Sequence, residues 1–133
     1  MSLINLLEIF KNSNEPGMQL DIFRENGQVL VQIYKQSDVK KLGIEVTLED
    51  NEGVVVELLF NERKCKNRKN HERFINSRII SSFVKVNSVK HETWFAVFSK
   101  NWLPKDVLIF IHDLIKEVYE LETSAIECTL NAY

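Results

Sequence analysis

The chain has 133 residues, of which 44% are hydrophobic and 27% are charged, and its formal net charge is −2. This length predicts a single domain, residues 1–133, that buries a hydrophobic core without help from disulfides or metals. The composition excludes a disordered chain, a collagen-like fibre and a disulfide-rich miniprotein, and the small net charge excludes a protein that is basic over its whole surface.

The sequence favours a cytoplasmic protein. Cys65 and Cys128 lie far apart and match no metal-binding spacing, so we expect reduced thiols. No stretch approaches the roughly 20 apolar residues that span a bilayer. The first residues lack the basic start of a signal peptide and reach Glu8 early.

The chain begins with a predicted amphipathic helix and a predicted β-hairpin. Leu3, Leu6, Leu7 and Phe10 share one helical face, and a helix this short must dock on the rest of the domain. The dipeptide at residues 26–27 is Asn-Gly, which favours a two-residue type I′ turn with positive φ at both positions. The resulting register pairs Arg24 with Val29, Phe23 with Leu30, Ile22 with Val31, Asp21 with Gln32, Leu20 with Ile33 and Gln19 with Tyr34.

Alternating apolar residues at 44–48 and a strand at 54–60 predict a second hairpin, with a three-residue loop at 51–53. This loop places apolar residues opposite one another on one face. The predicted pairs are Leu48 with Val56, Val46 with Leu58 and Ile44 with Phe60.

The segment 61–73 differs from the rest of the chain in its charge. It holds six bases and two acids, a local charge of +4, whereas the remainder carries −6. A segment with this composition does not belong in a core, so we expect an exposed basic loop or the start of a solvated helix. Three interpretations stay open: contact with nucleic-acid phosphates, docking of an acidic protein, and a purely solubilising role. The candidate binding residues are Arg63, Lys64, Lys66, Arg68, Lys69 and Arg73.

Residues 79–86 and 92–99 predict two further strands, because they are rich in β-branched and aromatic side chains. Both faces of this pair are largely apolar, which indicates either central strands or an outer face that meets a partner. Exposed aromatic side chains mark interaction surfaces, so Trp94, Phe95 and Trp102 form a candidate aromatic binding surface. The alternative is a core packed from both sides.

A long amphipathic helix is predicted from Pro104, which suits the first turn of a helix. Its apolar stripe includes Ile111 and Leu114. For residues 123–133 three alternatives remain: a helix extension, a short edge strand or a flexible tail. The predicted class is α+β: a curved antiparallel sheet of about six strands in three hairpins, with a short N-terminal helix and this long C-terminal helix packed on one face.

We find no catalytic motif. Four glycines exclude a glycine-rich phosphate loop, and the signatures of serine hydrolases and zinc proteases are absent. We expect His71, His91 and His112 to be solvated, and Cys65 with His71 lacks the further ligands that zinc needs. Four carboxylates suit a magnesium site or a plain solvated sheet face: Glu45, Glu49, Asp50 and Glu57. We therefore predict no catalytic residues, no metal and no cofactor.

These features predict a small non-enzymatic protein-binding module, in its most concrete form an inhibitor, an immunity protein or a chaperone-like protein that masks a partner. Small proteins of those kinds share the order helix, strands, helix, which is an analogy of architecture. Two alternatives remain: a nucleic-acid-binding protein that uses residues 63–73, and a small metal-dependent hydrolase. The expected partner is another protein, nucleic acid is the alternative, a membrane is not expected, and a homodimer is left open.

Overall fold

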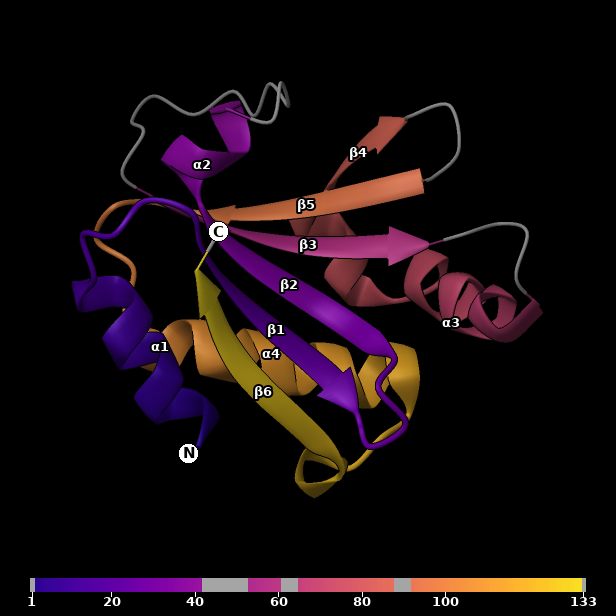
Figure 1. The fold of residues 1–133 in the computed structure, drawn as a ribbon. Coiled ribbons are helices and arrows are strands. Elements are labelled where there is room, and N and C mark those ends of the chain that lie inside the picture. The colour runs from indigo at the N-terminus through magenta and orange to yellow at the C-terminus, as the bar shows by residue number, and fades with distance from the viewer. Residues whose placement is uncertain (1, 42–52, 61–64, 88–91, 133) are drawn as a thin grey trace.

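The fold is an α+β arrangement of one antiparallel sheet with its longer helices packed on one face (Figure 1). The computed structural model describes residues 2–41, 53–60, 65–87 and 92–132. The helices are α1 (Leu3–Asn12), α2 (Gln36–Lys41), α3 (Cys65–Ile75) and α4 (Pro104–Tyr119), with the 3-10 helices η1 (Arg78–Ser82) and η2 (Thr123–Ala125). The strands are β1 (Met18–Arg24), β2 (Val29–Lys35), β3 (Val54–Phe60), β4 (Val84–Asn87), β5 (Glu92–Phe98) and β6 (Ile126–Ala132).

The strand order is β4-β5-β3-β2-β1-β6, and every neighbouring pair is antiparallel. The sheet is curled but not closed, so β4 and β6 form its two edges. The predicted class is therefore confirmed, with about six strands, a helix at the N-terminus and a long helix near the C-terminus. None of the helices in the described residues is long and apolar enough to cross a membrane.

One continuous core lies between the sheet and the helices. The amphipathic spacing of α1 and α4 places their apolar stripes on the inner face of the sheet, which is the face they cover. In α1 the predicted apolar stripe is confirmed, since all four of its residues are buried, and Ile111 and Leu114 of α4 are buried as well. The buried strand residues of this core are Leu20, Ile22, Leu30, Val31, Ile33, Val54, Val56, Leu58, Phe60 and Ala96.

The first hairpin keeps the predicted register at Leu20–Ile33 and Ile22–Val31 and then departs from it. A β-bulge follows, so Phe23 instead of Arg24 lies opposite Val29. Leu30, predicted to lie opposite Phe23, has no partner residue in β1 or β3 and joins the buried core. A bulge inserts such an extra residue into one strand and turns its side chain out of the normal alternation.

The carbonyl of Leu30 accepts a hydrogen bond from the hydroxyl of Tyr119, at the end of α4, over 2.7 Å. Burial raises the pKa of Tyr119 above its usual range, so its hydroxyl is a donor at neutral pH. Because a buried carbonyl needs a partner, this contact compensates for the ladder position that the bulge interrupts.

The predicted two-residue type I′ turn is wrong, because among the described residues only Gly27 and not Asn26 has a positive φ in this loop. The N–H of Gly27 donates to the carbonyl of Arg24, and the N–H of Arg24 donates to the carbonyl of Gln28, each over 2.9 Å. These bonds close a three-residue loop. Asn26 stabilises it through its side-chain oxygen, which accepts from the N–H of Gln28 over 3.0 Å.

The predicted pairing of residues 54–60 in a second hairpin is wrong, because β3 pairs with β2 and β5. Val56, expected opposite Leu48, lies opposite Ile33 of β2 on one edge and opposite Ala96 of β5 on the other. Both edges of the strand are occupied there, which agrees with its nearly continuous apolar sequence, as in central strands. Residues 44–48 and 51–52 lie outside the described residues.

The expectation of an exposed basic loop at 61–73 is wrong for residues 65–73, which belong to α3, whereas the alternative of a helix start agrees with the structure. Residues 61–64 lie outside the described part. Phe74 anchors α3 in the core, with ring centroids 5.3 Å from Phe60, 5.1 Å from Phe83 and 5.1 Å from Trp94. Burial of this one ring holds a helix that is otherwise mostly polar.

The predicted strand at 79–86 is shorter than expected, since η1 replaces its first part. The hydroxyl of Ser81 donates to the carbonyl of Arg78, and the N–H of Phe83 donates to the carbonyl of Ile80, both over 3.0 Å. Such local bonds compete with strand pairing. At the other end of the chain, the edge-strand alternative for 123–133 is correct for β6, which pairs with β1 along its whole length.

Replacing Gly27 with Val tests the turn. Gly27 has φ +85°, and a Cβ at this position meets no atom within 4 Å, so the cost comes from backbone strain alone. We expect a loss of about 1–2 kcal/mol in the free energy of unfolding, measured by urea titration. Gly27→Asn is the control and costs less, because Asn tolerates this conformation. An equal loss for both variants would contradict the strain argument.

Replacing Tyr119 with Phe tests the bulge. The ring stays buried while the carbonyl of Leu30 loses its donor. We expect the free energy of unfolding to fall by about 1–3 kcal/mol, the cost of an unsatisfied buried polar group. Urea unfolding at neutral pH measures this, and unchanged stability would show that the hydrogen bond contributes nothing to the bulge.

Candidate functional site

The face of the sheet opposite α1, α3 and α4, here called the outer face, carries the densest group of polar side chains among the described strands. The antiparallel register fixes its members, because directly opposed residues point to the same side. One row crosses all six strands through Thr129, Asp21, Gln32, Glu57, Phe95 and Val84. The flanking rows hold Asn131, Gln19, Tyr34, Val55 and Val97 on one side and Glu127, Phe23 and Val29 on the other.

Asp21 is the centre of a hydrogen-bond network on this face. Its Oδ1 accepts from the side-chain amides of Gln19 over 2.6 Å and Gln32 over 3.1 Å, and its Oδ2 accepts from the amide of Asn131 over 2.8 Å. The hydroxyl of Tyr34 donates to Oε1 of Gln32 over 3.1 Å. Because three amides hold one carboxylate, its orientation on the face is fixed.

Glu57 lies between this network and the apolar part of the outer face. Its two cross-strand neighbours are Gln32 of β2 and Phe95 of β5. Desolvation by burial raises the pKa of Glu57 from 4.5 to about 7. This carboxyl therefore holds its proton to a higher pH than an ordinary glutamate does.

Apolar side chains continue the outer face toward β4. Val55 and Phe95 are buried, and the partly buried Tyr34 and Val97 pack against them. Val84 is 64% exposed at the sheet edge. The outer face therefore changes from polar at β6 and β1 to apolar at β3, β5 and β4.

Charge is separated between the two sides of the sheet. Asp21, Glu57 and Glu127 belong to the outer face, whereas the register turns Arg24, Lys35 and Lys85 to the inner side. The inner position agrees with their contacts. The ammonium of Lys35 lies 5.5 Å from the ring centroid of Phe10, and that of Lys85 lies 5.8 Å from the ring centroid of Trp94. Within the described strands, the outer face is thus acidic and without cations.

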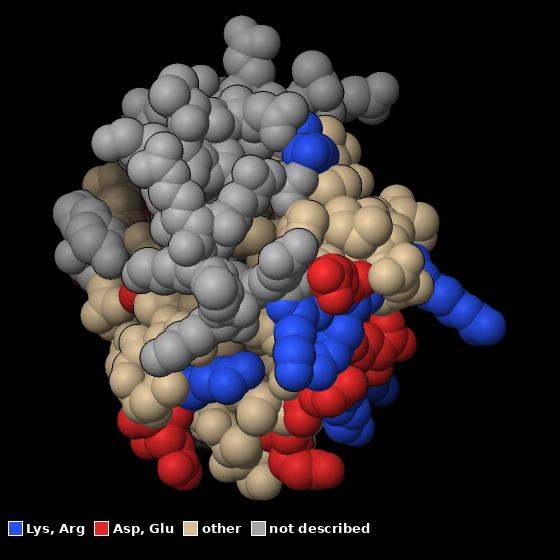
Figure 2. Space-filling view, turned by 90° about the vertical axis from the view of Figure 1, so that its right-hand side faces the viewer, with Lys and Arg blue, Asp and Glu red and all other residues tan. Residues whose placement is uncertain are grey.

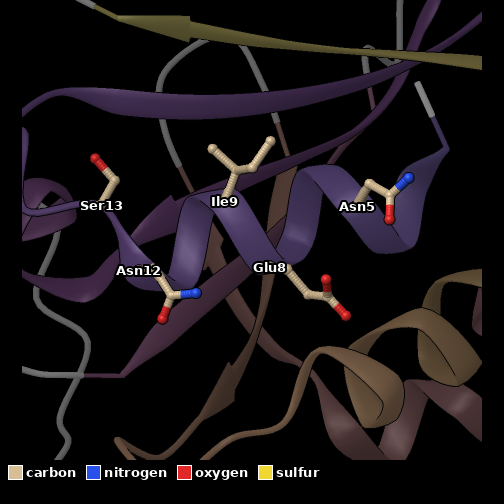
Figure 3. Close-up of a pocket in the computed structure, with 5 residues that line it drawn as sticks. All are labelled: Asn5, Glu8, Ile9, Asn12 and Ser13. Atoms are coloured by element: carbon tan, nitrogen blue, oxygen red, sulfur yellow. The ribbon is translucent and has the colours of Figure 1, made fainter.

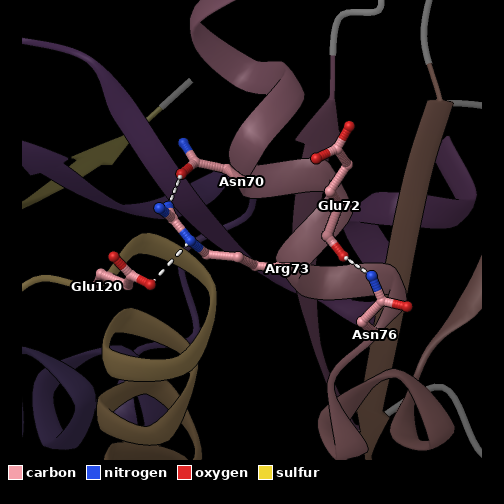
Figure 4. A network of polar contacts seen from close by, with 5 residues as sticks. All are labelled: Asn70, Glu72, Arg73, Asn76 and Glu120. Atoms are coloured by element: carbon pink, nitrogen blue, oxygen red, sulfur yellow. Dashed lines mark hydrogen bonds and ion pairs between the residues drawn. The ribbon is translucent and has the colours of Figure 1, made fainter.

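The candidate basic patch is only partly visible in the structure. Arg63 and Lys64 lie outside the described residues, and Lys66 and Arg68 belong to α3 with side chains outside the description. Lys69 is exposed. Arg73 pairs with Oε1 of Glu120 over 3.0 Å and donates to Oδ1 of Asn70 over 3.2 Å, so it ties α3 to the end of α4 (Figure 4). Its guanidinium therefore serves a structural contact within the fold.

Figure 2 shows the side of the molecule at the right of Figure 1, where α3 lies. Blue and red side chains alternate there among the described residues. Two exposed acids lie next to Arg73: Glu72 precedes it in the sequence, and Glu120 pairs with it in space. The use of the basic patch for binding stays a prediction.

The three candidate aromatic residues do not lie together. Phe95 is buried on the outer face, whereas its neighbour Trp94 points to the inner face and packs on Phe74. Trp102 is 8% exposed and packs against Phe10, with ring centroids 6.5 Å apart. Phe95 and Trp102 are thus part of the packed interior, and their role in binding a partner stays a prediction.

The carboxylates proposed for a metal site cannot be compared as a group, because Glu45, Glu49 and Asp50 lie outside the described residues. In the described part of the chain, no group of three or more His, Cys, Asp or Glu side chains could hold a metal ion. His71 is partly buried, with its ring centroid 5.1 Å from that of Phe60. His91 is not described, and His112 lines a groove next to β6.

Two grooves flank α1. One has a volume of about 700 Å³ and follows the exposed side of the helix, where Ile9 and Glu8 extend from opposite sides of the ribbon (Figure 3). The other, of about 670 Å³, lies where α1 begins and reaches α4 and β6. Its walls include Ile4, Leu108 and Cys128, and burial raises the pKa of the Cys128 thiol, so this sulfur is a weak nucleophile.

The outer face was only partly visible in the sequence. Asp21 opposite Gln32 and Gln19 opposite Tyr34 follow from the first hairpin, and Glu57 was already a candidate carboxylate. The contribution of Asn131 and Thr129 was missed, because β6 pairs with a strand more than a hundred residues earlier and no local signal reveals that pairing.

Comparison with known proteins adds no assignment: no protein-family model matches this chain, and no curated protein matches it.

Replacing Glu57 with Gln tests the electrostatics of the outer face. Folding raises the pKa of Glu57 above that of the unfolded chain, so the folded state holds this proton more tightly. The stability linked to the proton is fully present below the unfolded value of 4.5 and is lost as the pH rises to about 7. We therefore expect Glu57→Gln to gain about 3 kcal/mol relative to the wild type between pH 4 and pH 8.

Urea unfolding of both proteins across this pH range gives the difference directly. The same replacement at Glu127, an exposed carboxylate of the outer face, controls for the chemistry of the substitution. A difference between Glu57→Gln and wild type that is constant with pH would show that Glu57 is not desolvated.

Proposed function

We propose that this chain is a small non-enzymatic protein-binding module that masks a cationic, partly apolar segment of a partner with its outer face. Inhibitors, immunity proteins and chaperones act in this way. The observation that carries the proposal is the charge separation of the sheet, with Asp21, Glu57 and Glu127 on the outer face and the strand cations on the other side.

The arrangement of the outer face suits a polypeptide. Asp21 and Glu57 offer carboxylates to Lys or Arg side chains, and Gln32 between them helps to hold the carboxylate of Asp21 in place. Accessible apolar contacts lie beside them, since Val29 is 48% exposed and Phe23 and Val97 are partly exposed. Interfaces between proteins combine such apolar and polar groups.

The same charges disfavour nucleic acid on this face. Phosphates would meet three acids there, and repulsion between like charges costs affinity. Nucleic-acid binding would have to use the basic patch of α3, in which Arg73 already pairs with Glu120. We also propose a cytoplasmic location, which the expectation of reduced thiols supports.

Synthetic peptides test the proposal directly. The probe is a fluorescent peptide of alternating Lys and Leu, and its counterpart alternates Glu and Leu. We expect saturable binding of the Lys/Leu peptide in an anisotropy titration, at least about tenfold tighter than that of the Glu/Leu peptide, because only the first complements the outer face.

Variants locate the binding site. Asp21→Asn combined with Glu127→Gln removes two charges from the outer face and keeps the shapes of the side chains. Asp113→Asn combined with Glu117→Gln removes two charges from the exposed side of α4 and is the matched control. We expect the first pair to weaken Lys/Leu binding about tenfold and the second to leave it unchanged. Equal weakening by both pairs, or no binding by the wild type, would overturn the proposal.

A further inference from the structure

The free edge of β6 is the longest unpaired strand edge in the described part of the sheet. β6 has seven residues, Ile126–Ala132, and pairs with β1 on one side, while the strand order ends at its other side. An edge strand presents unpaired N–H and C=O groups, so it is a template for another strand.

Helix α1 contacts β6, but several other features that normally block the pairing of an edge strand are absent from β6. Natural edge strands are protected by Lys, by Pro, by bulges or by short length. The sequence of β6 contains neither Lys nor Pro, and Glu127 is its only charge. Its pairing with β1 runs through seven consecutive residue pairs without a register shift. The opposite edge, β4, has four residues and carries Lys85.

The residues of β6 complement their own antiparallel copy. A twofold axis perpendicular to the sheet keeps each face on the same side, and Thr129 is the middle residue of the strand. With Thr129 on the axis, Glu127 lies opposite the uncharged Asn131 of the partner subunit, so the two glutamates stand apart, while each Asn131 amide donates within its own chain to Asp21 and Thr129. Cys128 then lies opposite Leu130 of the partner subunit, which is an apolar pair on the inner face, and Ile126 lies opposite position 132 in register.

Shifts of this register are less favourable. Moving the axis to Cys128 leaves Asn131 opposite residue 125 of the partner, beyond the end of β6. Moving it to Glu127 places the two glutamates opposite one another, and like charges at a cross-strand pair are destabilising. Only the central register pairs all seven residues of the strand.

We infer that two copies of this chain associate through antiparallel pairing of β6 with β6, with Thr129 on the twofold axis, to form one continuous sheet across the dimer. This inference does not depend on the proposed function, since it concerns the edge of the sheet and no bound partner.

Disulfide trapping tests the register. In a chain with Cys65→Ser and Cys128→Ser, the replacement Thr129→Cys brings two thiols opposite one another across the axis. Glu127→Cys is the matched control, because its own copy lies about 13 Å away along the strand, beyond the reach of a disulfide. We expect mild oxidation to yield a covalent dimer of the first variant and not of the second, on a non-reducing gel.

Sedimentation of the full chain without cysteine replacements measures the association itself. We expect a reversible wild-type dimer and a dissociation constant raised at least about tenfold by Thr129→Glu, which places two carboxylates opposite one another. Thr129→Gln adds similar bulk without charge and should leave the constant nearly unchanged. A monomeric wild type, a dimer equally strong in Thr129→Glu, or equal cross-linking at positions 127 and 129 would overturn the inference.

Discussion

The bulge at Leu30 and its hydrogen bond to Tyr119 connect the two layers of the fold. The bulge turns Leu30 into the core and leaves Phe23 and Val29 on the outer face. The hydroxyl of Tyr119 donates to the Leu30 carbonyl, and this places the end of α4 against the first hairpin. The next residue, Glu120, adopts the left-handed conformation that ends α4.

The end of α4 also contacts α3. The carboxylate of Glu120 pairs with Arg73, while Phe74 beside it is buried under β3 and β5. An exposed ion pair contributes little stability by itself, so the ring of Phe74 holds α3 in place and the ion pair sets its orientation. Part of the basic character of α3 is thus used inside the molecule, whereas the charged side chains that the described strands place on the outer face are all acidic.

Local patterns were sufficient for the parts of the fold that depend on local sequence. The apolar stripes of α1 and α4 and the Leu20–Ile33 pairing followed from periodicity alone, because packing rewards the same spacing that the sequence shows. The bulge was not predictable, since it depends on a donor at Tyr119, 89 residues away from Leu30. The full extent of the helix at residues 65–75 could not be predicted for another reason, because one buried phenylalanine among charged residues creates no apolar stripe.

The candidate site illustrates the same limit. Asp21 and Gln32 could be paired from the first hairpin, but the third amide comes from Asn131, and the neighbour Phe95 of Glu57 comes from a strand far along the chain. The desolvation that raises the pKa of Glu57 to about 7 arises only when these strands assemble. Sequence alone names the carboxylates, whereas the sheet order decides which of them is solvated and which is close to neutral.

Because the pKa of Glu57 is raised, the affinity of the outer face for a cation depends on pH. A Lys or Arg side chain placed next to Glu57 stabilises its ionised form, so a cationic segment on the outer face releases a proton at neutral pH. By linkage, such binding strengthens as the pH rises toward and through 7. Asn131 has a place in both proposals. Its amide donates to Asp21 on the outer face, and in the inferred dimer it lies opposite Glu127 of the partner subunit. In the inferred dimer the outer faces of the two copies lie side by side along β6, so their carboxylates share one side of the continuous sheet.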